Sequence, residues 1–497
     1  MKPVKIAVLT DLHYEVRALR SVRRGDLAAI LLLRAVQRLN RFIRPDLVVV
    51  LGDLSDAGQM PDAATKLAQL RAILERLQCP WSVIPGNHDG DPDWFYRVMP
   101  RPPSWLDVAG CRFVPLLDEE RPAFNAFRPP AMMDRLMQAR VGFKGPLVAF
   151  QHISLHPPGA VACPYNLINA VEAIKVMEKA GVRLSLGGHY HKGFDLMTAG
   201  NLSFLSVPAL CEAPFPFYLV TLAANCIKAQ RQTLSMPPEL ELIDQHVHTP
   251  WAYCNENMDL KKAVELAEVF GLAGLAFTEH SSHLYFDRAR REAGDHCQAT
   301  PQSLESVKDS RVADYFAAIR KLRSARVIPG MEIDGNDWGG LVVTKADLAR
   351  CRLKIGAIHS LPALRRKNAA RAMVHDEFMA TLEKFVQTGI QVLAHPFRVL
   401  YHWERQHPEA LFAPVCRLLR DHRVAAELNF HTNEPPPKFF KMCIESGVKL
   451  VFGSDAHNLY EVGELAPHLE MLSAMGYDSG FGEFLSLAAK KHKGHKM

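Results

Sequence analysis

The sequence predicts an α/β protein of two domains, in which short apolar strands alternate with amphipathic helices. Its 497 residues exceed what a single hydrophobic core usually supports. The alternation of strand-like and helix-like patterns runs through both halves of the chain. The pair Pro237-Pro238 interrupts it near the middle, and a new series of apolar runs begins just after this pair. We therefore expect one domain over residues 1–236 and a second over residues 240–497.

In the first half, runs rich in apolar and β-branched residues predict five strands, with three helices between them. The expected strands are residues 6–9, 47–51, 81–84, 147–150 and 182–186. The expected helices are residues 26–43, 63–77 and 169–179.

The second half is more regular, with seven apolar runs separated by helical patterns. The expected strands are residues 240–243, 272–277, 327–328, 355–358, 392–394, 425–428 and 450–452. The expected helices are residues 261–270, 311–322, 376–386, 410–420 and 436–445. Strand–helix units in succession indicate a parallel sheet that can close into a barrel, with its chemistry at the C-terminal ends of the strands.

The composition is that of an ordinary globular protein, with 48% hydrophobic and 23% charged residues. A net charge of +6 suits an anionic substrate but is far below that of a dedicated nucleic-acid binder. None of the ten cysteines forms a C-x-x-C pair, so reduced thiols are expected. No signal peptide precedes the first strand, and the longest apolar stretch, 27–33, is far shorter than the roughly 20 residues of a membrane helix. We expect a cytoplasmic protein with no membrane partner.

In the first half, five short polar pieces each follow an apolar, strand-like run. Aspartate, asparagine and histidine together are a mixed oxygen and nitrogen donor set that suits Mn, Fe or Zn. Glycines before three of the pieces permit sharp turns close to a ligand. The pieces are Thr10-Asp11-Leu12-His13, Gly52-Asp53-Leu54-Ser55-Asp56, Gly86-Asn87-His88-Asp89, Gln151-His152 and Gly188-His189-Tyr190-His191.

This series resembles the D-x-H, G-D-x-x-D, G-N-H-D/E, H and G-H-x-H motifs of the calcineurin-like metallophosphoesterases. The resemblance implies a four-layer α/β/β/α sandwich with two divalent metals (Mn, Fe or Zn), bridged by Asp53, that hydrolyses a diester rather than a monoester. It gives His88 the role of contacting the phosphoryl group or protonating the leaving oxygen. One ion would be held by Asp11, His13, Asp53 and His191, and the other by Asp53, Asn87, His152 and His189.

The second half has its own polar series. Six imidazoles among eight candidate ligands suit Zn, Mn or Fe, and Glu332 is placed to bridge two ions. The pieces are Asp244-Gln245-His246-Val247-His248, Thr278-Glu279-His280, Gly330-Met331-Glu332, Ala357-Ile358-His359, Ala394-His395-Pro396 and Ser454-Asp455-Ala456-His457.

This pattern resembles the PHP superfamily, named for its polymerase and histidinol-phosphatase members. The resemblance implies a distorted (β/α)7 barrel with two or three divalent metals (Mn, Zn or Fe) and Glu332 as a catalytic-site residue. The implied ligands are His246, His248, Glu332 and Asp455 for the first ion, Glu332, His359 and His395 for the second, and His280 and His457 for the third.

One position departs from the PHP pattern. The family places a histidine or an acid five or six residues after the second histidine of H-x-H, where this sequence has Tyr253 and Cys254. Either Cys254 supplies a thiolate to the third ion, or it fills space and the third site is weak; the second alternative is the commoner fate of a cysteine. His283, Arg398 and His431 lie near the motifs, where they can contact a phosphate or remain ordinary solvated or core-edge residues.

Together the two series predict a bifunctional phosphoesterase. The N-terminal site would open a small nucleotide-like or glycerol-type phosphodiester, and the C-terminal site would hydrolyse a phosphomonoester. The expected partner is a small phosphorylated substrate. A nuclease is the alternative, disfavoured because no basic stripe interleaved with aromatic residues is present. A second alternative is one active domain joined to a regulatory or binding domain.

Overall fold

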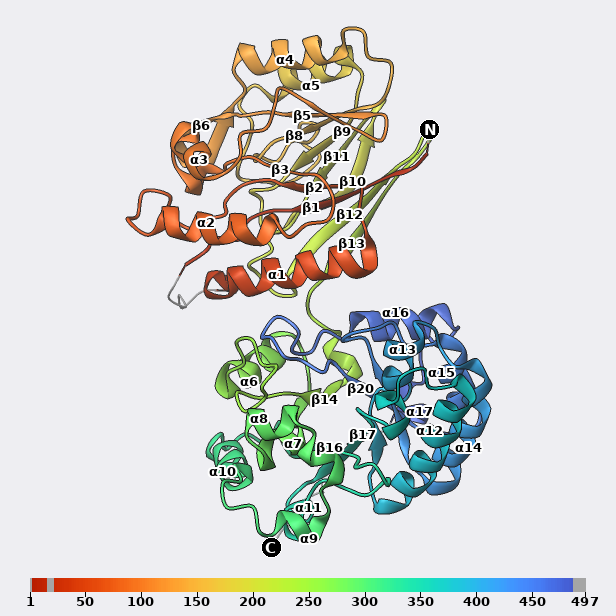
Figure 1. Ribbon diagram of the computed structural model, residues 1–497. Coiled ribbons are helices and arrows are strands. Elements are labelled where there is room, and N and C mark those ends of the chain that lie inside the picture. The colour runs from red at the N-terminus through yellow and green to blue at the C-terminus, as the bar shows by residue number, and fades with distance from the viewer. Residues whose placement is uncertain (1, 16–21, 486–497) are drawn as a thin grey trace, which may run out of the picture. The chain divides into compact units, whose positions relative to one another are not determined.

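A computed structural model describes residues 2–15 and 22–485 of the chain (Figure 1). The backbone separates into two compact units, Met1–Ser235 and Met236–Met497. Among the described residues, no helix has both the length and the apolar character needed to cross a bilayer.

The first unit contains two main sheets. The five-stranded sheet has the order β13 (Ile227–Thr233), β12 (Pro216–Leu222), β1 (Val4–Leu9), β2 (Leu47–Val50) and β3 (Trp81–Val83). The six-stranded sheet has the order β10 (Phe194–Ala199), β11 (Leu202–Ser206), β9 (Val182–Gly187), β8 (Leu147–Phe150), β5 (Cys111–Pro115) and β4 (Leu106–Val108). Strands β1, β2 and β3 are parallel, as are β5, β8, β9 and β11. Their C-terminal ends therefore deliver several loops to one edge of each sheet.

The two sheets pack face to face around a shared apolar core. Val8 and Val49 of the first sheet join Phe113, Phe150 and Leu186 of the second in one buried cluster. Figure 1 shows helices beside the outer faces: α1 (Ala28–Arg38) and α2 (Ala63–Leu74) near the first sheet, and α4 (Pro130–Arg140) and α5 (Ala170–Ala180) near the second. A short helix, α3 (Pro92–Val98), and the hairpin β6 (Glu119–Arg121) and β7 (Asn125–Phe127) lie in the connections. The four-layer α/β/β/α sandwich expected from the sequence is confirmed.

All five strands expected in this unit form, within two residues of their predicted limits. Strands β4 and β5 and the four strands β10 to β13 were not expected from the sequence. Several of these have exposed polar faces: in β13, Lys228, Gln230 and Arg231 are exposed. Such edge strands have no continuous apolar run, so they are hard to recognise from hydrophobicity.

The second unit is a seven-stranded parallel sheet with helices between successive strands. Its order is β14 (Ile243–Val247), β15 (Gly274–Phe277), β16 (Val327–Asp334), β17 (Leu353–Ala357), β18 (Val392–Leu393), β19 (Ala425–Asn429) and β20 (Leu450–Gly453). Just past β14 and β20, His248 N donates to Ala456 O at 3.0 Å and Asp455 N donates to His246 O at 2.8 Å. The first and last strands therefore meet, and the sheet nearly closes into the expected (β/α)7 barrel.

The connections of the barrel are helical. They are α6 (Leu260–Val269), α7 (Ser281–Tyr285), α8 (Arg288–Glu292), α9 (Pro301–Leu304), α10 (Val312–Lys321), α11 (Lys345–Leu348), α12 (Arg371–Phe385), α13 (Arg398–Glu404), α14 (Phe412–His422) and α15 (Pro437–Glu445). Two more helices, α16 (Ala466–Ala474) and α17 (Phe481–Phe484), follow the last strand.

Two strands of the barrel differ from the prediction in a way that bears on the site. Strand β14 begins at Ile243 rather than 240 and continues through Asp244 to Val247. Strand β16 continues six residues past the predicted end at Ile328, to Asp334. Polar residues that line the site interrupt the apolar pattern although the backbone remains extended. His246 and Glu332 therefore lie inside strands, not after them.

Candidate metal centres

In the N-terminal unit, the predicted residues lie on loops at strand ends and have an unusual backbone. Asp11, His13, Asp53 and His189 all have positive φ, between 46° and 65°. Asp11 N donates to Gly52 O at 3.0 Å and His13 N donates to Asp53 O at 2.8 Å, which joins the loops after β1 and β2. Positive φ costs on the order of 1–3 kcal/mol at a non-glycine residue and concentrates at functional sites.

A first group of donors joins Asp11, His13 and His191. Asp11 Oδ1 lies 3.7 Å from His13 Nε2 and 3.5 Å from His191 Nε2, and the two ring nitrogens are 3.1 Å apart. Asp11 Oδ1 is buried and has no hydrogen-bond partner. A buried oxygen beside two convergent imidazole nitrogens needs a cation among them, so this group fits a divalent metal.

A second group is built around His152. Its Nε2 lies 3.1 Å from Asn87 Oδ1, 3.1 Å from His189 Nδ1 and 3.3 Å from Asp53 Oδ2. Asp53 Oδ2 also lies 3.6 Å from His13 Nε2, which belongs to the first group. One carboxylate oxygen thus stands between the two groups, as a bridging ligand would.

The outer nitrogens of these imidazoles are all held by protein acceptors. His13 Nδ1 donates to Asp56 Oδ1 at 3.1 Å, and His191 Nδ1 donates to Glu212 Oε1 at 2.6 Å. Backbone carbonyls accept from the other two rings: Leu51 O from His152 Nδ1 at 2.7 Å, and Phe124 O from His189 Nε2 at 2.9 Å. These bonds select the tautomer that turns the remaining lone pair towards the ion.

The carboxylates of this centre raise the pKa values of two of its buried imidazoles. Burial lowers the pKa of His13, but hydrogen bonds to Asp11 and Asp56 outweigh it and raise the pKa to about 9. Burial also opposes protonation of His152, yet the charge of Asp53 raises its pKa to about 10. Protons therefore occupy these rings when no metal does, and metal binding must displace them.

His88 lies beside the two groups without belonging to either. Its backbone N donates to Asp53 Oδ1 at 2.8 Å, and its Nδ1 donates to the Asp56 carbonyl at 2.7 Å. Only Nε2 remains to exchange a proton with a substrate. The neighbouring Asp89 accepts from Ser55 N and Gly86 N, which fixes the loop that presents His88.

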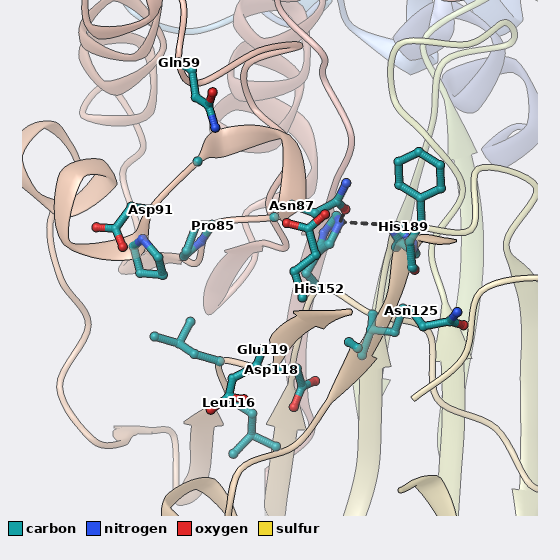
Figure 2. A pocket seen from close by; sticks show the side chains of 18 residues that line it. Gln59, Pro85, Asn87, Asp91, Leu116, Asp118, Glu119, Asn125, His152 and His189 are labelled. Carbon is teal, nitrogen blue, oxygen red and sulfur yellow. Dashed lines mark hydrogen bonds between the residues drawn. The ribbon is translucent and has the colours of Figure 1, made fainter. Parts of the chain in front are cut away.

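A pocket of about 460 Å³ adjoins this centre. Figure 2 shows Asn87, His152 and His189 together at one side of it, with Pro85 and Asp91 across from them. Its lining residues include no lysine or arginine. They do include four carboxylates, those of Asp91, Asp118, Glu119 and Glu120.

In the C-terminal unit, Glu332 occupies the middle of the predicted residues. Its Oε1 lies 3.0 Å from His395 Nε2 and 3.3 Å from His359 Nε2. Its Oε2 lies 2.5 Å from His280 Nδ1 and 3.5 Å from His246 Nε2. The two carboxylate oxygens thus face different sets of imidazoles, which is the arrangement of a bridging ligand.

Asp455 and His457 complete the C-terminal centre. Asp455 Oδ1 lies 2.9 Å from His248 Nε2 and 3.5 Å from His246 Nε2. Each of His248, His280 and His457 offers a ring nitrogen within 4.8 Å of the other two. His246 Nε2 is buried without a hydrogen-bond partner, so this donor set also fits divalent ions.

Three of these imidazoles donate a hydrogen bond from Nδ1 to a carboxylate. His246 Nδ1 donates to Glu427 Oε1 at 2.7 Å, His248 Nδ1 to Glu279 Oε1 at 3.2 Å, and His359 Nδ1 to Asp334 Oδ1 at 2.8 Å. The sequence analysis assigned no role to Glu279, Asp334 or Glu427, nor to Glu212 in the first unit. Glu279 and Asp334 adjoin or follow a predicted ligand and were recognisable as candidates, whereas Glu212 and Glu427 adjoin none, and Glu427 lies 181 residues from its imidazole.

Three further residues face the C-terminal centre. Arg398 Nη1 donates to Asp455 Oδ2 at 2.6 Å, and its Nε is buried without a partner. The ring of His431 stacks on that of His457, with 4.6 Å between the ring centroids. Cys254 Sγ lies 3.6 Å from His280 Nε2, and burial, with the charges of Glu279 and Asp455, raises the pKa of its thiol to about 12.

The structure thus gathers all the predicted ligands into two centres, one in each unit. Comparisons with known families agree. The calcineurin-like phosphoesterase family model matches residues 4–193, and the PHP domain model matches residues 244–431. No curated protein sequence matches this chain significantly.

Among solved structures, similar folds include metal-dependent phosphatases. A dimetal phosphatase from Danio rerio is 18% identical, with a TM-score of 0.38, over 46% of this chain and 96% of its own. A purple acid phosphatase from yellow lupin (Lupinus luteus) is 12% identical, with a TM-score of 0.35, over 47% of this chain and 52% of its own.

Proposed function

We propose a division of labour within this chain, a metal-dependent phosphoester hydrolase that contains a calcineurin-like phosphoesterase domain and a PHP domain. The N-terminal centre opens a small phosphodiester. The C-terminal centre then removes phosphate from the resulting monoester. Both centres belong to one chain, so the tether raises the local concentration of the intermediate at the second centre.

One observation supports two separate hydrolytic centres above all others. Each unit has a carboxylate placed between two sets of donors, Asp53 in the first and Glu332 in the second. Divalent ions bound there would supply Lewis acidity to the phosphoryl group and lower the pKa of a water nucleophile. A chain with one hydrolytic and one regulatory domain would not need both arrangements.

The pocket beside the N-terminal centre supports a diester substrate. A diester has a second organic arm, and a volume of about 460 Å³ next to Asn87 and His152 gives that arm space. Of the four carboxylates in the lining, Asp118 pairs with Arg128 and Glu119 with Arg121. No lysine or arginine is itself in the lining, so a neutral or cationic arm fits better than a polyanionic nucleic acid. His88, with Nδ1 held by the Asp56 carbonyl, delivers a proton from Nε2 to the leaving oxygen.

The C-terminal centre has features that suit a monoester. A phosphomonoester has one more negative charge than a diester and needs more cationic partners. Arg398 donates to Asp455 through Nη1 and to Asn429 through Nη2, and its buried Nε is the donor left for a phosphate oxygen. His431, stacked on His457, is a second donor at the same place.

The test separates the two activities by mutation. Mn-loaded wild type, Asp53→Ala and Asp455→Ala are compared for turnover of a generic aryl phosphodiester and of the matching monoester. We expect Asp53→Ala to lose diester turnover alone and Asp455→Ala to lose monoester turnover alone. The exposed, ion-paired Asp62 and Asp421 provide Asp62→Ala and Asp421→Ala as controls. Loss of both activities in one variant, with both retained in the other, contradicts the proposal.

The order of the two reactions has its own readout. With a diester as substrate, wild type should release inorganic phosphate, whereas Asp455→Ala should accumulate the monoester. If the monoester accumulates to the same extent in both proteins, the two centres do not act in sequence. Salt-sensitive binding of single-stranded nucleic acid would support the nuclease alternative instead.

A further inference from the structure

A thiol lies at one side of the C-terminal centre, held there by the fold. Cys254 Sγ is 3.6 Å from His280 Nε2. Its loop is fastened to the segment after β20: Glu256 N donates to His457 O at 3.0 Å, and Asn458 Nδ2 donates to Glu256 Oε2 at 2.6 Å. These bonds hold the loop that carries Cys254 against the segment that carries His457.

The neighbouring imidazoles turn free lone pairs towards the same region. His457 Nδ1 donates to the Asp455 carbonyl at 2.8 Å, which leaves its Nε2 unprotonated. His280 places Nδ1 2.5 Å from Glu332 Oε2, so its Nε2 is the nitrogen that faces the thiol. His280 belongs both to a group with His248 and His457 and to a group with Cys254 and His283. The thiol thus extends a cluster that already offers convergent nitrogens.

His283 has a different role because its tautomer is constrained. Its Nδ1 accepts from Tyr253 N at 3.2 Å, so the neutral ring has its proton on Nε2. That nitrogen is buried without a partner, on a side chain that is 2% exposed. A buried N–H without an acceptor, next to Cys254, is satisfied by a negatively charged sulfur or by a substrate oxygen. His283 therefore offers this N–H to a metal-bound sulfur or to a substrate oxygen and does not compete for the ion.

We propose that Cys254 binds a third divalent ion of the C-terminal centre as a thiolate, together with His280 and His457. On binding, the S–H bond breaks, a sulfur–metal bond forms and the proton leaves to solvent. Thiolate is a soft ligand, so this position selects Zn²⁺ over Mn²⁺. The inference rests on the proposed function only in assuming that the C-terminal centre binds metal.

The chain contains its own control for a labelling experiment. Cys226, in the turn between β12 and β13, is the other cysteine classed as exposed among the described residues. The full chain is stripped with a chelator, alkylated with iodoacetamide with and without added Zn²⁺, and analysed by peptide mass spectrometry. We expect Zn²⁺ to reduce labelling of Cys254 by about tenfold or more, because a metal-bound thiolate is not free to react. Labelling of Cys226 should not change, and Mn²⁺ should protect Cys254 much less.

A spectroscopic measurement tests for the sulfur–metal bond itself. Cobalt(II) bound to a thiolate gives charge-transfer absorption in the near ultraviolet. The wild type and Cys226→Ser should show this band, and Cys254→Ser should not. Cys254→His, which supplies a nitrogen ligand instead, should restore retention of the third ion without the band. Circular dichroism of each variant verifies that it is folded.

Two results would overturn the inference: equal labelling of Cys254 with and without Zn²⁺, or a charge-transfer band that persists in Cys254→Ser. Neither readout involves a substrate. A protein that turns over both esters but fails these tests keeps its proposed function and loses only the thiolate. A protein that passes these tests but hydrolyses neither ester keeps the thiolate ligand and loses the proposed function.

Discussion

The two centres of this chain share one geometry but differ in the groups that accept hydrogen bonds from their imidazoles. Both place a carboxylate between two donor sets, Asp53 in the sandwich and Glu332 in the barrel. Behind the imidazoles, however, the N-terminal centre uses two carboxylates and two backbone carbonyls, whereas the C-terminal centre uses three carboxylates and one carbonyl. A carboxylate behind an imidazole makes it more basic and a stronger ligand. We therefore expect the barrel to hold divalent ions more tightly than the sandwich.

The largest effect should come from the bridging carboxylates. Asp53→Asn and Glu332→Gln keep the shape of the side chain but remove the negative charge that stands between two donor sets. We expect each to lower the activity of its own unit by about 10³-fold, since several kcal/mol of charge stabilisation are lost. Metal content measured by mass spectrometry should fall in that unit only. If both units lose metal in a single variant, the centres are not independent.

His88 should affect catalysis without affecting metal content. Its Nδ1 bonds to the Asp56 carbonyl and its backbone to Asp53, so the side chain is not needed to hold an ion. We expect His88→Gln to lower kcat for the diester by about 10²–10³-fold, as for loss of a general acid. The loss should shrink for a diester with a very acidic leaving group. An equal loss for good and poor leaving groups would contradict proton delivery by His88.

The supporting carboxylates test the comparison directly. Glu427→Gln in the barrel and Glu212→Gln in the sandwich each weaken one imidazole by removing the charge behind it. Each should lower metal affinity about 10–100-fold, measured by competition with a fluorescent chelator. In the wild type, the sandwich should lose metal at a lower chelator concentration than the barrel. The opposite order would show that the number of supporting carboxylates does not decide retention.

The last prediction concerns the pH dependence of metal binding. Without metal, the pKa values of His13 and His152 are about 9 and about 10, so both rings are protonated at pH 7. Metal binding displaces these protons. The apparent affinity for the metal should therefore rise with pH until the pH exceeds the pKa values of both rings. The slope should be about tenfold per pH unit for each proton released, measured by calorimetry in buffers of different ionisation enthalpy. Binding that releases no protons would show that the rings are already neutral.

Much of the site was predictable because its ligands follow recognisable strands. Asp11, Asp53 and His152 come directly after apolar runs of parallel strands, whose C-terminal ends meet at one edge. The predicted limits of β14 and β16 were wrong because His246 and Glu332 are polar residues that lie inside these strands. The hydrophobic pattern stops at the polar residues of a site, even though the extended strand continues through them.

By itself, the sequence determined the number of domains, their α/β class and the donors available to each centre, because these depend on local periodicity and residue chemistry. Only the tertiary structure decided which atoms of those donors face one another. It placed Glu212 within hydrogen-bond distance of His191 Nδ1 and Glu427 within hydrogen-bond distance of His246 Nδ1. These bonds fix which ring nitrogen keeps a free lone pair. These contacts join segments up to 181 residues apart, and their formation depends on the packing of whole sheets, to which no local pattern is sensitive.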